Sequence, residues 1–388
     1  MIEPLAPESP VSTPPRGRLG SVSNVLIAGT GSHVPDQVIT NEDLAALGCD
    51  SEWIIRRTGI RERRHAKVGE ATSDLCVHAA EQAMKDAGVT AADLDLILIA
   101  TITPDHPTPS TACHVQRRLG STAPAMDLGA ACAGFMYALV TAAQFIATGN
   151  HQCVLIVGAD LMSRTIDPDD KKTYPLFGDG AGAVIVVPNT PVLRNAVGRV
   201  GSSSTASSSD DASGRDADAS ITNGAPSGHH HDDPVDGLLA YQLGSEGCGG
   251  EMLCIPAGGT RLPHSPITHE AGQQFLKMDG RSVFKWAVRI VDESAKAVMR
   301  AANVAPNELD LVVLHQANQR IIDSAVSDLG ISAGKVFVNL DRYGNTSGAS
   351  IPLALDEAVR SGKLNRGDLC LLCGFGAGLA WGTALIRW

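Results

Sequence analysis

The cysteine in "DLGAACAGF" (127–135) is a residue whose type and place could do chemistry. Cys132 follows a short apolar stretch and precedes "AGFMYALVTAAQFIA", whose apolar spacing is typical of a helix. A cysteine at a helix N-terminus has free amides and the helix dipole to stabilise a thiolate. Its small neighbours let a substrate approach closely. The alternative is an inert buried thiol, and this stretch taken alone favours that alternative.

Two polar residues in the second half are the next candidates. His315 in "LHQANQR" ends a buried strand, at the sheet edge where α/β proteins place their sites. A neutral imidazole that donates a hydrogen bond is tolerated there, although a core histidine is the simpler interpretation. Asn345 in "DRYGNTSGASIPLAL" lies in a glycine-flanked turn, where an ordinary turn or cap role is the simpler interpretation. The glycine-rich "GFGAGLAWG" (374–382) lacks the helix and lysine of a phosphate loop, so its amides would face another ligand.

Alternating strand and helix patterns must position these residues. Short apolar runs predict buried strands at "VLIAG", "LDLILIAT", "CVLIVGAD", "GAVIVV", "LDLVVLH", "KVFVNL" and "LCLLCGF". Helical spacing predicts helices over 71–87, 134–148, 281–302 and 319–329. The fold class is therefore α/β, with a sheet that helices largely cover.

An internal repeat indicates a duplicated unit. "AMKDAGVTAADLDLILIATIT" (83–103) aligns without gaps on "VMRAANVAPNELDLVVLHQAN" (298–318), at an offset of 215 residues. A second echo pairs "GDGAGAV" (178–184) with "GFGAGLA" (374–380), at an offset of 196. Two halves built on one plan are the expected architecture.

Composition excludes several classes of protein. The chain has 388 residues, is 44% hydrophobic and has a net charge of −11, which argues against nucleic-acid binding. No apolar run is long enough to span a bilayer. Nine cysteines scattered over the chain indicate reduced thiols, and together with the lack of a signal sequence they predict a cytoplasmic protein.

Two segments have the composition of disorder. Residues 1–21 are rich in proline and serine, and residues 201–234 are rich in Ser, Asp, Ala and Gly. "HHHDD" (His229 to Asp233) could hold a metal loosely, but a flexible tract is the favoured interpretation, and no metal site is expected. The predicted domains are an N-terminal half over 22–195 that carries the nucleophile and a C-terminal half over 235–388 that carries His315 and Asn345.

The motifs together resemble the β-ketoacyl-[acyl-carrier-protein] synthase III family of thiolase-like condensing enzymes. They are "SEWIIRRTGIRERR" (51–64), "ACAGF" (131–135), "FGDGAGA" (177–183), "HQANQR" (315–320), "GNTSGASIP" (344–352) and "GFGAGLAWGTALIRW" (374–388). The resemblance runs from about Val25 to Trp388, interrupted by 201–234, and implies a duplicated thiolase-like fold with helices around its sheets.

The resemblance also implies a chemistry. Cys132 would take an acyl group from acyl-CoA, and malonyl-ACP would then lose CO₂ and condense with it to give 3-oxoacyl-ACP. His315 and Asn345 would stabilise the enolate, and the backbone amides of Cys132 and Ala377 would form the oxyanion hole. Ala377 replaces a glycine common in the family, which matters little because the N–H does the work. No cofactor is implied.

Binding roles follow from the same resemblance. Trp53, Arg57 and Arg164 would contact CoA, although "RRTGIRERR" can also be a solvated basic loop. A cationic patch for the acyl carrier protein would comprise Lys285, Arg289, Gln316, Ala317, Asn318, Gln319 and Arg320. A homodimer is expected, without nucleic acid or membrane as partner.

Two departures from the family are visible. Thr108 stands where a phenylalanine often closes the partner's acyl pocket, so with Phe375 it would shape a pocket for a longer or branched primer. The insertion lengthens the chain between Cys132 and His315, at small entropic cost. The alternatives are a specialised-metabolism ketosynthase with a different acceptor, and a catalytically silent module that binds a carrier protein.

Overall fold

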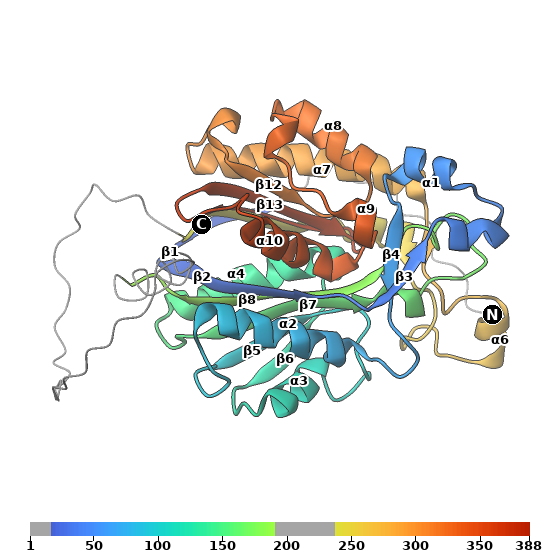
Figure 1. Ribbon diagram of the computed structural model, residues 1–388, viewed down its shortest axis with the longest axis horizontal. Coiled ribbons are helices and arrows are strands. Elements are labelled where there is room, and N and C mark those ends of the chain that lie inside the picture. Colours follow the sequence, from blue (N-terminus) through green and yellow to red (C-terminus); the bar gives the residue numbers. More distant parts are fainter. Residues whose placement is uncertain (1–16, 191–236) are drawn as a thin grey trace, which may run out of the picture.

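The computed structural model describes residues 17–190 and 237–388, which form two five-stranded sheets between layers of helices (Figure 1). The first sheet has the strand order β2-β8-β7-β5-β6, and the second has the order β1-β9-β14-β13-β12. Two short hairpins, β3-β4 and β10-β11, lie outside these sheets. The insertion (201–234), its "HHHDD" and residues 1–16 lie outside the described residues.

Element bounds follow the predicted alternation closely. The strands are β1 (Arg18–Ser23), β2 (Val25–His33), β3 (Gln37–Thr40), β4 (Glu62–His65), β5 (Leu96–Ala100), β6 (Ala125–Leu128), β7 (Val154–Leu161), β8 (Asp179–Pro188), β9 (Gly237–Ser245), β10 (Leu253–Cys254), β11 (Lys277–Met278), β12 (Leu311–Leu314), β13 (Leu369–Gly376) and β14 (Ala380–Arg387). The helices are α1 (Ser51–Thr58), α2 (Thr72–Ala87), α3 (Thr111–Leu119), α4 (Gly134–Ala147), α6 (Pro266–Glu270), α7 (Gly280–Ala301), α8 (Gln319–Leu329), α9 (Leu340–Tyr343) and α10 (Ser350–Arg360).

Five layers stack through the molecule. α2 and α3 cover one face of the first sheet, α7 and α8 cover one face of the second, and α4 and α10 lie between the sheets (Figure 1). The central layer is the most apolar because both sheets press on it: α4 buries nine of its fourteen residues. Both α4 and α10 begin at the same level of this layer, so their N-termini can build one site.

The sheets confirm the duplication. Parallel strands β5 and β7, then antiparallel β8 and β2, match parallel β12 and β13, then antiparallel β14 and β9. The aligned segments 83–103 and 298–318 each hold a helix end, a turn and a buried strand, as predicted. The glycine echo is not structural, because 178–184 lies mainly in β8, the counterpart of β14, whereas 374–380 spans the end of β13 and its turn.

Residues 18–21 correct one predicted boundary. They belong to β1, which pairs antiparallel with β9 in the second sheet, so the first strand of the chain completes the other half. Only Val22 of this strand is buried, so the sequence has none of the apolar alternation by which a strand is found. Backbone pairing with β9 defines β1.

A second correction concerns "KVFVNL" (335–340), which was expected to be a strand. Only Val336 bridges to Val312, and α9 already begins at Leu340. The amide of Asn339 donates to Gln316 Oε1 at 3.1 Å, which turns the chain away from the sheet. The run therefore occupies the position of β6 in the repeat without forming a strand.

Candidate active site

Cys132 lies at the turn between β6 and α4. Ala131 has a φ of +47°, a conformation that residues other than glycine adopt rarely, and a 3₁₀ turn (Ala131–Ala133) then runs directly into α4. We call residues 129–134 the Cys132 turn. The thiol is buried (7% exposed), and Gly376 of the second half packs so closely that a Cβ there would lie 2.9 Å from the amide nitrogen of Cys132.

The Cys132 thiol faces Ser347 of the second half, with 3.4 Å between Sγ and Oγ. Burial raises the pKa of this thiol to about 12, and the contact with Ser347 acts in the opposite direction. The expected helix-stabilised thiolate is therefore not the resting form, because loss of water outweighs the dipole. The thiol is protonated at neutral pH and must lose its proton as it reacts.

His315 follows directly on β12 and is buried (2% exposed). Its Nδ1 lies 2.6 Å from the hydroxyl of Ser350, the first residue of α10, and the Phe375 ring packs edge-on against it at 5.1 Å. Burial lowers the pKa of His315 to about 3, so the imidazole is neutral. If Nδ1 accepts the Ser350 proton, Nε2 carries the hydrogen and can donate it to a substrate oxygen.

Asn345 begins the loop that leads into α10. Its backbone is bonded on both sides to the segment before β8, since its amide donates to Leu176 and its carbonyl accepts from Gly178. Its side-chain Oδ1 accepts the Ser347 amide at 2.9 Å. That bond fixes which end of the carboxamide is the acceptor, and the NH₂ end is the donor that faces a reaction.

A single turn of the second half therefore connects the three predicted residues. Residues 345–350, which we call the Ser347 turn, contain Asn345, contact Cys132 through Ser347 and hold His315 through Ser350. Ala377 is half-buried and comes one residue after Gly376, so its amide lies in the loop that passes the Cys132 turn. The arrangement places a thiol beside two neutral hydrogen-bond donors.

An apolar cluster adjoins Ala377, and the sequence reasoning missed it. Its buried members are Met162, Ile166, Phe177, Leu253 and Leu276, with Ile102 and Ala377 packed against them. Phe177 forms a bridge with Asn345, which connects the cluster to the Ser347 turn. These residues come from loops and short strands of both halves, so no periodicity in the sequence marks them.

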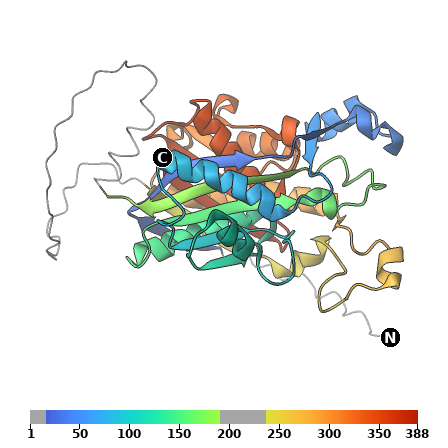
Figure 2. The same cartoon turned by 60° about the horizontal axis from the view of Figure 1, so that its bottom comes forward.

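The expected CoA residues lie in two places. The Arg57 guanidinium stacks on Trp53 within α1, 5.2 Å from the ring centroid. Arg164 instead donates to the carbonyl of Lys67 at 2.6 Å, beside β4. Trp53 and Tyr174 both pack against the buried cluster of Leu44, Cys49 and Ile54, and Tyr174 packs edge-on against His65 of β4. Figure 2 shows α1 and α6 projecting from the end of the molecule opposite the C-terminus.

The expected carrier-protein patch is partly assembled. Asn318 donates to the Arg57 carbonyl, and Arg320 stacks over Phe284 at 5.4 Å, next to Lys285 on α7. These contacts place the N-terminus of α8 beside α1, the helix that carries Trp53.

Three residues of that patch differ from the expectation. Gln316 is buried (1% exposed) and bonds to the backbone of Leu314, so this part of the prediction is wrong and Gln316 is an interior anchor. Ala317 packs on the core of the second half. Arg289 is held by Glu246 at 2.8 Å and by Glu293 at 3.2 Å, which neutralises its charge locally.

The two acyl-pocket candidates are far apart in character. Thr108 is exposed on the loop before α3, and Phe375 is buried against His315 and Trp286. Exposure suits Thr108 to reach a neighbouring molecule and not to line a pocket of its own subunit. Phe375 instead limits the movement of the His315 ring.

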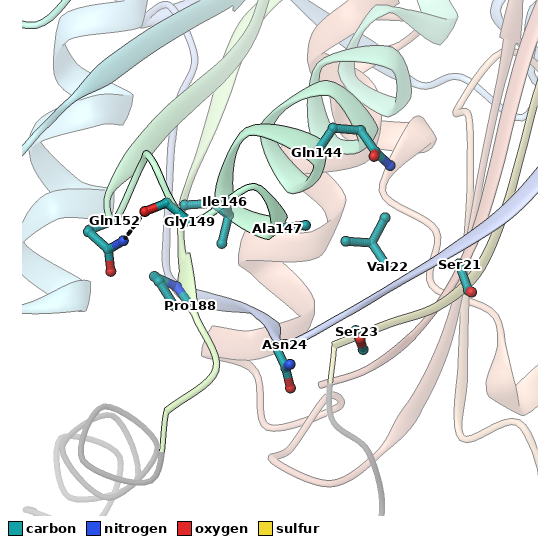
Figure 3. A pocket seen from close by; sticks show the side chains of 10 residues that line it. All are labelled: Ser21, Val22, Ser23, Asn24, Gln144, Ile146, Ala147, Gly149, Gln152 and Pro188. Carbon is teal, nitrogen blue, oxygen red and sulfur yellow. Dashed lines mark hydrogen bonds between the residues drawn. The ribbon is translucent and has the colours of Figure 1, made fainter. Parts of the chain in front are cut away.

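A pocket of about 340 Å³ opens at the far end of α4 (Figure 3). Gln144, Ile146 and Ala147 line it on one side, and Asn24 and Pro188 line it on the other. Because α4 has fourteen residues, this pocket lies about 20 Å from Cys132, at the opposite end of the helix. It is separate from the candidate site. Across the described ranges, none of the helices has the length and apolarity to cross a membrane.

Comparisons with known proteins agree with this arrangement. Two family models match: 3-oxoacyl-[acyl-carrier-protein] synthase III over residues 126–204, and the C-terminal model of the same name over residues 299–388. The β-ketoacyl-[acyl-carrier-protein] synthase III of Rhodopirellula baltica is 65% identical over 95% of this chain and all of its own length. That of Natranaerobius thermophilus is 43% identical over 95% of this chain and all of its own length.

Solved structures give the same result. The 3-oxoacyl-[acyl-carrier-protein] synthase III of Aquifex aeolicus superposes with a TM-score of 0.76 at 38% identity, over 95% of this chain and all of that chain. A priming β-ketosynthase from the R1128 polyketide pathway superposes with a TM-score of 0.77 at 32% identity, over 96% of this chain and 98% of that chain. The sequence and the duplicated fold of this chain thus place it in the β-ketoacyl-[acyl-carrier-protein] synthase III family.

Proposed function

We propose that the chain starts fatty-acid synthesis. Cys132 takes an acyl group from an acyl-CoA primer, and decarboxylative condensation with malonyl-ACP then gives 3-oxoacyl-ACP, CO₂ and free CoA. One observation carries the proposal: the Ser347 turn holds the Cys132 thiol, the Asn345 carboxamide and, through Ser350, the His315 imidazole. A nucleophile beside two neutral donors suits thioester chemistry in which charge develops on oxygen.

Acyl transfer comes first. The Cys132 sulfur attacks the thioester carbonyl of the primer, and the carbonyl oxygen becomes an anion that the amides of Cys132 and Ala377 stabilise. The carbon–sulfur bond to CoA then breaks, and the proton of the Cys132 thiol ends on the departing CoA sulfur. Because the resting thiol is protonated, attack and proton loss are coupled.

Condensation follows on the acyl-enzyme. The thioester oxygen of malonyl-ACP accepts hydrogen bonds from His315 Nε2 and Asn345 Nδ2, which stabilise the enolate formed as CO₂ leaves. The enolate carbon attacks the acyl carbonyl on Cys132, and the sulfur leaves and regains a proton. Burial keeps His315 neutral, so it can act as a donor without a fixed charge in the core.

The apolar cluster beside Ala377 is the surface for the primer chain. Met162, Phe177 and Leu276 are buried in it and adjoin the oxyanion loop. Together with the small Thr108, which we assign to the closing position of the partner's pocket, it favours a longer or branched primer. A kcat/KM for acetyl-CoA above those for octanoyl-CoA and isobutyryl-CoA would contradict this preference.

The partners are assigned by charge and shape. Trp53 and Arg57 serve the CoA nucleotide with Arg164, and Lys285, Asn318, Gln319 and Arg320 serve the acidic carrier protein. Arg289 contributes less because Glu246 and Glu293 already pair with it. The protein works in the cytoplasm, with no cofactor and with neither nucleic acid nor membrane as partner.

A homodimer completes the site. β6 is the edge of the first sheet, and its Met126 is an exposed large apolar side chain (41% exposed). An unpaired edge with an apolar side chain is a surface that a second copy can cover. The exposed Thr108 loop precedes α3, the helix that leads to β6, and can reach that copy.

The deciding experiment uses acyl-CoA without malonyl-ACP. Purified protein is mixed with acetyl-, butyryl- or octanoyl-CoA, and intact mass is compared with a Cys132→Ser control. One acyl increment that the control lacks is expected. No increment with any primer contradicts the proposal and favours a silent carrier-binding module. An adduct that fatty-acid malonyl-ACP does not consume favours a specialised ketosynthase, a candidate that the R1128 likeness supports.

A further inference from the structure

Asp160, at the end of β7, is a fully buried carboxylate that the reaction above does not use. Within the described ranges no lysine or arginine pairs with it. Its Oδ1 accepts from Thr101 Oγ1, the Ile102 amide and Thr103 Oγ1 at 2.8 to 3.1 Å, and its Oδ2 accepts the Gly348 amide at 2.9 Å. Burying a carboxylate costs free energy unless hydrogen-bond donors compensate for the lost water. These donors therefore fix the position of the Asp160 carboxylate.

That place is the junction of the two halves. One oxygen binds the loop after β5, in the first half, and the other binds the Ser347 turn, in the second. A Cβ on Gly348 would lie 3.2 Å from Asp160 Oδ2, so the glycine lets the turn approach the carboxylate this closely. Asp160 therefore fixes where the Ser347 turn sits relative to the first half.

The Ser347 turn contains Asn345 and contacts Cys132. Ser347 adopts a φ of +53°, its amide orients the Asn345 carboxamide, and its hydroxyl lies on the Cys132 sulfur. Such a backbone conformation persists only where its surroundings impose it. Burial raises the pKa of the Asp160 carboxyl, while hydrogen bonds from Ile102, Ser347 and Gly348 act in the opposite direction. Within one turn, therefore, the Ser347 hydroxyl contacts the sulfur and the next amide, that of Gly348, binds the carboxylate.

We propose that Ser347 and Asp160 are positioning residues for the condensing reaction: Asp160 holds the Ser347 turn through the Gly348 amide, and the Ser347 hydroxyl donates a hydrogen bond to the Cys132 sulfur as that sulfur becomes anionic. The inference rests on the proposed function for its role in turnover. When the sulfur attacks, the Ser347 hydroxyl, which already contacts it, donates to it, and the carboxylate keeps its bonds to Thr101, Ile102, Thr103 and Gly348. No proton is transferred to Asp160 in this step, and the thiol proton leaves with CoA as before.

The two residues have opposite effects on the thiol. Removing the Ser347 hydroxyl removes a donor to the anion, which disfavours the thiolate. Removing the Asp160 charge removes a nearby negative charge, which favours the thiolate but loosens the turn that orients Asn345. A purely structural role gives no reason for the two variants to move the thiol in opposite directions.

The test measures iodoacetamide alkylation of the buried Cys132 at pH 8, resolved by peptide mass because the exposed Cys113 and Cys248 also react. Ser347→Ala, which keeps the backbone and its Cβ, should slow alkylation about tenfold. Asp160→Asn should speed it about threefold, while kcat for condensation falls about a hundredfold with KM for acyl-CoA unchanged. Ser32→Ala, which removes a hydroxyl from a different buried aspartate, Asp356, is the matched control and should change neither rate.

Alkylation needs no acyl-CoA, so the inference and the proposed function can fail separately. Wild-type protein that loads no primer contradicts the condensing reaction, whereas the alkylation rates still report on the hydroxyl and the carboxylate. Equal rates in the wild type and Ser347→Ala, or shifts in the same direction for both variants, would overturn the inference. Circular dichroism identifies variants that do not fold, and Ser347→Ala suffices if Asp160→Asn is one of them.

Discussion

The Cys132 turn and the Ser347 turn occupy the same position in the two halves but carry different side chains. Each turn contains a short 3₁₀ segment that runs into a helix of the central layer. The first residue of that segment has a positive φ in both halves, +47° for Ala131 and +53° for Ser347. The Cys132 turn packs against β13 of the second half, and the Ser347 turn packs against β7 of the first half, the counterpart of β13. By this superposition Cys132 corresponds to Gly348.

The strands that receive the turns have exchanged roles as well. Gly376 at the end of β13 packs on Cys132, and Asp160 at the end of β7 binds Gly348. One junction therefore pairs a glycine on the strand with a thiol on the turn, and the other pairs an aspartate on the strand with a glycine on the turn. The same backbone arrangement therefore occurs twice. It holds a thiol where the glycine is on the strand, and it holds an anchoring carboxylate where the glycine is on the turn.

The largest expected effect on activity comes from replacing His315, directly after β12, by the residue at the equivalent position of the first half, at the end of β5. His315 corresponds to Ala100 by the 215-residue offset, so His315→Ala puts the first-half residue in its place. Condensation should fall by about a hundredfold or more, because a donor to the enolate oxygen is lost. Acylation of Cys132 should change less than about threefold, and separate assays of adduct mass and 3-oxoacyl product check both. Equal losses in the two assays would contradict the division of labour.

A smaller effect is expected from adding one methyl group to each junction. In Gly376→Ala the new Cβ would lie 2.8 Å from the Cys132 Cβ, so the Cys132 turn must move, and acylation should fall about tenfold. In Gly348→Ala the nearest contacts are at 3.2 Å and do not involve the thiol, so acylation should fall less. Rates of adduct formation by mass, with melting temperatures as the stability control, test this order, and the reverse order would refute the comparison.

Acid should weaken the second half through His315, while burial also lowers the pKa of His33 and His65 in the first half. Burial holds the pKa of His315 at about 3, below its ordinary 6.5, so the unfolded chain binds the proton more tightly between those values. Stability is full above pH 6.5 and is lost as pH falls, by about 2 kcal/mol from this residue at pH 5. Urea unfolding at pH 7 and pH 5 should show that loss in the wild type and a smaller one in His315→Ala. An equal loss in both would contradict the assignment.

The smallest effect concerns the other aspartate that joins the halves. Asp356 on α10 accepts from Thr30 and Ser32 of β2 and pairs with Arg360. Ser32→Ala should cost about 1 kcal/mol of unfolding free energy. Neither acylation nor condensation should change, since this junction touches no reacting group. Denaturant titration with both assays checks it, and a loss of activity at full stability would show that the two junctions are not distinct.

The sequence predicted the duplication from an internal repeat, and it proposed Cys132, His315 and Asn345 as reacting residues through the resemblance of their motifs to the family. Cys132 precedes a strongly apolar helix, and His315 ends an apolar strand within the repeat. The Ser347 and Asp160 network was missed because the two turns share only one identical residue, Ala133 with Ala349, so the correspondence exists in the backbone and not in the letters. The prediction of a resting thiolate at Cys132 was also wrong. The protonation state depends on how deeply the thiol is buried, and the spacing of residues in the sequence does not show burial.

Strands with little apolar character were equally hidden. β1 has one buried side chain and was assigned to an extension, and "KVFVNL" has the letters of a strand but is turned aside by the Gln316 side chain. In both cases a partner distant in the sequence decides the structure. Local pattern finds elements that stabilise themselves through packing and misses those held by pairing.

β1 replaces β9 as the edge strand of the second sheet, and its register shift between Gly20 and Val22 interrupts that edge. It covers β9, whose other side pairs with β14 along its whole length, so a chain shortened to begin at Val25 would leave a row of free amide and carbonyl groups on the second sheet. Such an edge is a template for pairing with other chains. Six residues that bury a single side chain therefore substitute an interrupted edge for the regular edge of β9.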